Sequence, residues 1–194
     1  MRNLIRRVLS GFAAIASTGL LLSPISSLAD TLDFSIFPVG PQGNPVLILP
    51  QATITSFGDD IYVGAHGHYE ICALNGFTCN ADMKISFNGA VNNLSFVTSG
   101  AEAGDHIDVS AYNGSFLLGV VGQSTDGFVD LSGFSNVTSI YIDDSSTAAG
   151  MAYDGFTFTA AAPVPEPETY AMLLAGLVLL GFAARRRKLK GVAA

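Results

Sequence analysis

The sequence predicts an all-β fold, a single antiparallel β-sandwich of jelly-roll-like type between two apolar end segments. Three observations carry this prediction. Apolar and polar residues alternate over short runs, Gly, Asn, Asp and Ser separate these runs, and no stretch between residues 30 and 160 has the apolar spacing of an amphipathic helix. About ten short strands in about 130 residues favour two packed sheets around one core.

The expected strands follow one another along residues 30–160. They are 32–36, a segment around Ile54, 61–73 with a bend at Gly64 and Gly67, 83–87, 94–96, 107–111, 116–121, 129–131, 137–142 and 151–158. Within 61–73, alternation places Tyr69 on the apolar face and Glu70 on the polar face. Asn113-Gly114 predicts a hairpin, because this dipeptide supplies the two positive φ angles of a type I′ turn.

The N-terminal segment, residues 1–29, has the three parts of a signal peptide. A basic start with Arg2, Arg6 and Arg7 is followed by an apolar run over 8–22 and by Ser27-Leu28-Ala29, a small-x-small cleavage site. We expect cleavage between Ala29 and Asp30. The alternative is an uncleaved membrane anchor, which the shortness of the apolar run disfavours.

The charge of residues 30–160 is strongly acidic. Lys84 stands against fourteen acidic residues between Asp30 and Asp154, which gives a net charge of about −13. Such a domain repels nucleic acid and anionic lipid headgroups, so nucleic acid is excluded as a partner. The same charge keeps the domain soluble and could attract divalent cations.

The two cysteines are close in sequence. Cys72 and Cys79 flank Asn75-Gly76, a turn-forming pair that can bring the two sulfur atoms together. In an exported chain these residues are expected to form a disulfide. Two free thiols or a metal-binding pair are the alternatives.

The C-terminal segment combines a proline-rich linker, an apolar helix and a basic end. Residues 161–169 form the linker, 170–184 the predicted transmembrane helix and 185–194 a basic cytoplasmic tail. The helix would measure about 22 Å, short for a bilayer core of about 30 Å, and snorkelling side chains could cover the difference. The stop-transfer cluster is Arg185, Arg186, Arg187 and Lys188, which makes a buried core helix a poor alternative.

This segment resembles the PEP-CTERM sorting signal, which consists of a Pro-Glu-Pro motif, a short transmembrane helix and an Arg-rich end. The motif here is Pro165, Glu166 and Pro167. The resemblance implies recognition in the inner membrane by an exosortase-type processing enzyme, cleavage near this motif, and passage of the domain to the cell surface or extracellular matrix. It also implies an association with exopolysaccharide, biofilm and floc formation.

Several polar groups inside the domain could carry chemistry. His66, His68 and Glu70 share one strand face and could share a metal, although three side chains facing water is the favoured interpretation. The loop acids could hold a structural Ca²⁺; they are Asp59, Asp60, Asp126, Asp143 and Asp144. We assign no metal site and no cofactor.

Catalysis has little support in the sequence. G-x-S-x-G is absent, and His106 beside Asp105 and Asp108 reads as ordinary strand polarity. We therefore expect a non-catalytic surface or matrix protein. A Ca²⁺-assisted carbohydrate-binding module is one alternative, with sugar contacts falling to Tyr62, Tyr112 or Tyr141 because the chain has no Trp. A secreted glycoside hydrolase with paired carboxylates is another.

Overall fold

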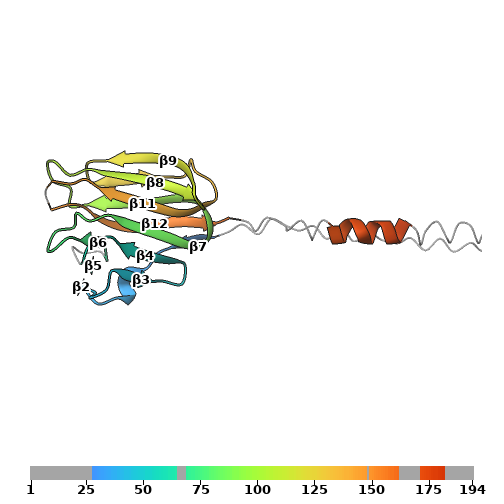
Figure 1. The fold of residues 1–194 in the computed structure, drawn as a ribbon, viewed down its shortest axis with the longest axis horizontal. Helices are drawn as coiled ribbons and strands as arrows, with labels where there is room; N and C mark the ends of the chain where they lie inside the picture. Colours follow the sequence, from blue (N-terminus) through green and yellow to red (C-terminus); the bar gives the residue numbers. More distant parts are fainter. Residues whose placement is uncertain (1–27, 65–68, 148, 162–170, 182–194) are drawn as a thin grey trace, which may run out of the picture.

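The computed structural model describes residues 28–64, 69–147, 149–161 and 171–181, and in them twelve strands pair into one sheet (Figure 1). The strands are β1 Ala29–Thr31, β2 Gly40–Pro41, β3 Val46–Ile48, β4 Ala52–Ser56, β5 Asp60–Val63, β6 Ile71–Leu74, β7 Met83–Ser99, β8 Ile107–Asn113, β9 Phe116–Gln123, β10 Gly127–Asp130, β11 Val137–Asp144 and β12 Ala152–Ala160. All ladders between these strands are antiparallel, and the sheet is not closed. The predicted all-β antiparallel fold is confirmed, and the jelly-roll-like description stays a prediction.

The sheet has two branches that share β7, a strand of seventeen residues. The first half of β7 lies between β4 and β11, which continues the first branch as β3-β4-β7-β11-β8-β9. The second half lies between β12 and β10, which continues the second branch as β2-β5-β6-β12-β7-β10, with β1 also on β12. Residues 83–87 and 94–96, predicted as separate strands, therefore belong to one strand.

β7 changes branch at a bulge around Asn92 and Asn93. Asn93 has a φ of 52°, and the ladders of β7 with β11 and with β12 both shift register in this region. The Asn92 side chain accepts a hydrogen bond from the Asn136 amide at 2.7 Å, and the Asn93 amide group donates to Thr159 Oγ1 at 3.1 Å. A bulge bends its strand and re-aims the side chains that follow, so β7 can serve both branches.

Both branches bury their apolar side chains in one hydrophobic cluster. Its largest members are aromatic. Phe96 stacks on Phe156 with ring centroids 4.8 Å apart, while Phe34 meets Phe156 and Tyr153 meets Phe96 edge-on at 6.0 Å. Offset and edge-on pairs of this kind add to the stabilisation from burial. The aromatic centre of the core is therefore built from β7, β12 and the segment after β1.

The segment after β1 differs from the prediction. Residues 32–36 were predicted as a strand, but Phe34–Ile36 is a 3-10 helix, η1. The Asp33 side chain accepts a hydrogen bond from the Ser35 amide at 2.9 Å and caps this turn. Short capped turns of this type compete with strand structure where Asp or Ser is available.

The β8–β9 hairpin is present as predicted, but its turn lies one residue further along. Asn113 pairs with Phe116, so the loop residues are Gly114 and Ser115, of which Gly114 has a positive φ of 59°. The prediction of Asn113-Gly114 as the turn centre was wrong. Glycine adopts positive φ without steric cost, and the Gly114 amide also donates to Thr138 Oγ1 at 2.7 Å.

The predicted run 61–73 splits into β5 and β6, with residues 65–68 outside the described part. The Gly64 amide donates to the Glu70 carbonyl oxygen at 2.8 Å as the chain returns. The predicted apolar face is present in both strands, where Ile61, Val63, Ile71 and Ala73 are buried. The assignment was wrong for Tyr69, which is 46% exposed, and Glu70, which is buried. These two residues lie between β5 and β6, and alternation holds only within a strand.

The predicted signal-peptide boundary falls at β1. Ala29 pairs with Thr159 and Asp30 with Phe158 of β12. Residues 1–27 lie outside the described residues, so cleavage between Ala29 and Asp30 stays a prediction. Cleavage there would leave Asp30 and Thr31 to pair with β12.

Gly150 provides a test of the packing between the second branch and the loop after β6. It has a φ of 79°, and a Cβ at this position would overlap the backbone of Cys79. We expect Gly150→Ala to lower the free energy of unfolding by at least about 2 kcal/mol, because strain and overlap add. The measurement is denaturant unfolding followed by circular dichroism. Gly133→Ala is the control: a Cβ at Gly133 meets open space, so a change within about 0.5 kcal/mol is expected, and equal losses for both variants would contradict the packing argument.

Candidate functional site

The strand register places two rows of polar and aromatic side chains on the outer face of the first branch. Met83, Ile85, Ile140 and Ile142 point to the core, so the residues between them point outward. One row across the paired strands is Thr55, Lys84, Tyr141, Ser110 and Val120, and the next is Thr53, Ser86, Ser139, Tyr112 and Leu117.

A groove of about 310 Å³ lies in this face. We call it the aromatic groove; its lining residues are Phe57, Lys84, Tyr112, Gly114, Ser115, Ser139 and Tyr141. Phe57 follows the end of β4, and Gly114 and Ser115 are the turn of the β8–β9 hairpin. The groove therefore joins three regions that are far apart in sequence.

Tyr141 is held in place from two sides. Its ring lies 5.4 Å from that of Phe57, centroid to centroid, and its hydroxyl donates a hydrogen bond to Asp82 Oδ2. The other oxygen of Asp82 accepts from the Asp144 amide at 3.0 Å. The hydrogen bond to Asp82, with burial and nearby negative charge, raises the pKa of Tyr141 to about 12. Tyr141 is thus an oriented and protonated aromatic side chain.

Lys84 is the basic residue of this acidic domain. It is exposed and stands between Thr55 and Tyr141 in its row. Two tyrosines, an exposed phenylalanine, an ammonium group and serine hydroxyls together offer apolar stacking surfaces and hydrogen-bonding groups. The groove is therefore suited to a ligand that has both apolar faces and hydroxyl groups.

Of the five acids considered for Ca²⁺, Asp143 and Asp144 lie at the end of β11 and not in a loop as predicted. Asp59, Asp60 and Asp126 accept hydrogen bonds from backbone amides. Asp60 accepts from the amides of Gly43 and Asn44, both at 2.9 Å. Burial raises the pKa of Asp60, but these amide donors lower it by more, so the net shift is downward. Asp59 and Asp126 accept from the amides of Gly76 and Ala101 at 2.8 and 2.7 Å.

Metal ligation finds no support in the described ranges, where no group of three or more His, Cys, Asp or Glu side chains could hold an ion. Of the predicted strand-face set, His66 and His68 lie outside these ranges. Glu70 is buried and accepts a hydrogen bond from the Ser99 hydroxyl at 2.5 Å. His106, directly before β8, has its Nε2 atom 3.5 Å from Oδ1 of Asp108 on β8, and both side chains are about half exposed.

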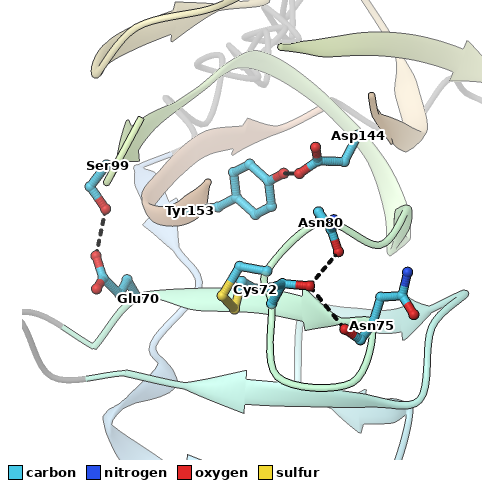
Figure 2. Close-up of a disulfide and its surroundings, with 9 residues drawn as sticks. Glu70, Cys72, Asn75, Asn80, Ser99, Asp144 and Tyr153 are labelled. Atoms are coloured by element: carbon cyan, nitrogen blue, oxygen red, sulfur yellow. Dashed lines mark hydrogen bonds between the residues drawn. A yellow bond between two sulfur atoms is a disulfide. The ribbon is translucent and has the colours of Figure 1, made fainter. Parts of the chain in front are cut away.

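Figure 2 shows the disulfide and the buried polar groups around it. The predicted disulfide is present: Cys72 and Cys79 are bonded, with their Cα atoms 5.3 Å apart. It closes a short loop, which stabilises the fold by about 2–3 kcal/mol in the chain-entropy estimate. Beside it, the buried Tyr153 hydroxyl donates to Asp144 at 3.1 Å, and burial is the largest cause of the raised pKa of both groups (Figure 2).

The C-terminal segment contains a helix at residues 171–181, inside the predicted 170–184. Its side chains are apolar and exposed, with Met172 76% and Leu179 70% exposed. In the part of the chain that can be described, no helix is both long and apolar enough to cross a membrane. Pro165, Glu166 and Pro167 lie outside the described residues, as do Arg185, Arg186, Arg187 and Lys188.

Comparison with known families identifies this tail. The model of the PEP-CTERM protein-sorting motif matches residues 163–188, a span that holds the Pro-Glu-Pro motif, the apolar helix and the basic cluster. The motif indicates an exported protein that an exosortase-type enzyme processes and sorts to the cell surface. The chain therefore carries a PEP-CTERM protein-sorting motif at residues 163–188. No curated protein and no solved structure matches it.

Sequence reasoning found part of the aromatic groove. Of the three tyrosines named for the carbohydrate-binding alternative, Tyr112 and Tyr141 line the groove, whereas Tyr62 lies on β5 in the second branch and does not. Phe57 and Lys84 were missed as site residues. Lys84 alternates with buried Met83 and Ile85, which indicates an outward position, but its neighbours depend on strand pairing.

The raised pKa of Tyr141 predicts a stability change in alkali. Its folded-state pKa of about 12 exceeds the ordinary 10.0, so its stabilising effect is complete below pH 10 and is lost as the pH rises towards 12. We expect the unfolding free energy of the wild type to fall more steeply over this interval than that of Tyr141→Phe. Denaturant titrations at several pH values measure this. Tyr69→Phe, at an exposed tyrosine, should keep the steeper wild-type dependence, and a wild-type slope for Tyr141→Phe would contradict the assignment.

Proposed function

We propose that this protein is a non-catalytic component of the cell surface or extracellular matrix, delivered there by its sorting tail. The signal peptide at 1–29 starts export, and the helix at 170–184 holds the chain in the inner membrane with Arg185 to Lys188 on the cytoplasmic side. Processing near Pro165 to Pro167 then frees the domain. The observation that carries this proposal is the motif match over residues 163–188.

Two structural features support delivery of the domain as a separate unit. The hydrophobic core draws its buried side chains from residues 32–158, so none of them is lost when the tail is cut. The helix at 171–181 exposes apolar side chains around its surface instead of packing them into that core, which fits a segment made for a lipid environment. We place the domain in a matrix that contains exopolysaccharide, as the resemblance of its tail to the PEP-CTERM signal implies.

A second candidate function, glycan binding, is favoured by the aromatic groove. Sugar rings present apolar C–H faces that stack on aromatic rings, and hydroxyl groups that bond to serine, tyrosine and lysine side chains. A domain with a net charge of about −13 repels anionic polymers. Lys84 is the one lysine in this background, and the negative charges of Asp82 and Asp143 act on the neighbouring Tyr141. The ligand class that fits is therefore an uncharged polysaccharide segment.

Two alternatives from the sequence receive less support. Ca²⁺-assisted binding would need carboxylates at the groove. The residues that line it include Lys84 and no Asp or Glu. A glycoside hydrolase needs two carboxyl groups flanking the sugar, and the groove lining supplies none. An activity panel of glycoside substrates, with the mature protein, tests the hydrolase alternative directly.

The sorting proposal is tested at Glu166. We expect Glu166→Ala to leave the chain unprocessed in the membrane fraction, because the enzyme reads the Pro-Glu-Pro motif. Cell fractionation followed by intact-mass measurement reports location and both cleavage sites. Glu168→Ala removes the same charge two residues further on and should be processed normally. Recovery of the wild type from cells with both termini intact would contradict the proposal.

Glycan binding is tested at Tyr112, which lines the groove, because the Tyr141 hydroxyl also has a structural hydrogen bond to Asp82. We expect Tyr112→Ala to weaken retention of the mature surface form in gels containing the producer's purified neutral polysaccharide by about tenfold, since one stacking contact contributes about 1–2 kcal/mol. Tyr62→Ala is the matched control and should bind as the wild type does. Chelator should have no effect; equal loss in both variants, or no retention of the wild type, refutes this function.

A further inference from the structure

β9 forms a long open edge of the sheet. It is the last strand of the first branch and pairs with β8 along one side (Figure 1). Its eight residues, Phe116–Gln123, contain no charged residue and no proline. Three of its apolar side chains are well exposed: Phe116, Leu117 and Val120, at 71%, 47% and 50%. The backbone N–H and C=O groups on its free side have no strand partner in the described residues.

The other edges are protected in the ways that soluble proteins use. β1 has three residues and contains Asp30, and β2 has two and ends in Pro41. β3 has three and follows Pro45, and β10 has four and ends in Asp130. Short strands, prolines and charges discourage pairing with another chain. β9 has none of these three features. Its ladder with β8 has one register shift, at Leu118, and the regular stretch 119–123 beyond it leaves this edge open to pairing in a way that the others are not.

The side chains of β9 would extend both faces of the sheet across a new strand. Val120 and Leu117 point outward, opposite Ser110 and Tyr112 of β8. Leu118 and Val121 pack partly buried against the core, and the Phe134 ring lies against Gly119. A strand added here needs apolar residues on both of its faces, whereas a strand that is polar on one face would leave one of these surfaces unmatched.

We propose that the partner of this edge is β9 of a second copy, paired antiparallel about a two-fold axis. β9 is itself a strand with apolar residues on both faces, and in an isologous pair each copy supplies what the other needs. Each domain has a net charge of about −13, so two copies repel each other. β9 contains no charged residue and therefore adds nothing to this repulsion at the contact. A charged partner strand would find no opposite charge on β9.

This pairing is independent of the sorting and glycan-binding proposals. The contact is one strand wide, so it is weak in dilute solution and grows where copies are crowded on one surface. Repulsion between the acidic domains opposes it, so it should strengthen when the Debye length falls from about 10 Å to about 3 Å between about 0.1 M and about 1 M salt. Ion-pair contacts would respond in the opposite direction.

The experiment is hydrogen–deuterium exchange of the full chain in detergent micelles at low and high protein concentration. We expect amides of β9 to gain protection of about tenfold at high concentration and high salt, while β3, another edge strand, does not change. Chemical cross-linking at the same concentrations measures the dimer fraction.

Val120→Lys places two like charges near each other in the dimer and should weaken association by at least about tenfold. Ile48→Lys is the matched control, since it makes the same apolar-to-lysine change at a 74% exposed position on β3, and it should dimerise as the wild type does. Concentration-independent exchange of wild-type β9, or equal association of the two variants, overturns the proposal. The wild-type exchange result decides the question even if Val120→Lys does not fold.

Discussion

The bend in β7 is the constraint on which the rest of this structure depends. One strand of seventeen residues pairs with four others, and the bulge at Asn92 and Asn93 turns it from β4 and β11 towards β12 and β10. The hydrophobic cluster forms because β7 contributes to both branches: Ile85 packs on one side of the bulge and Phe96 on the other. Asn92 and Asn93 supply hydrogen bonds at the bend that an apolar residue could not supply.

The acidic character of the domain is largely explained by its loops. Asp33, Asp59, Asp60, Asp126 and Asp130 accept hydrogen bonds from nearby backbone amides. A carboxylate is well suited to this role, because bonds to a charged acceptor are stronger than neutral ones. The charge that keeps the exported domain soluble therefore also fixes its turns. The lining of the aromatic groove and strand β9 contain none of these carboxylates.

The sequence allowed a good prediction wherever the signal was local. The prediction of the Cys72–Cys79 disulfide required only the spacing of the cysteines and the evidence for export. The prediction of the β8–β9 hairpin required only Asn113-Gly114 between two apolar runs. The errors arose where a local rule met a competing one. Asp33 caps a 3-10 turn where a strand was predicted, and the positive φ falls on Gly114 and not on Asn113. Tyr69 and Glu70 lie between β5 and β6, where strand alternation does not apply.

By itself, the sequence determined the all-β class, the disulfide and the sorting tail, because alternation, cysteine spacing and the Pro-Glu-Pro, helix and Arg cluster are all read along the chain. The tertiary structure decided which strands became neighbours. Only pairing brings Phe57, Lys84, Tyr112 and Tyr141 into one groove and leaves β9 at an edge. Strand pairing joins residues far apart in sequence, and the choice among many possible registers depends on burying the whole core at once.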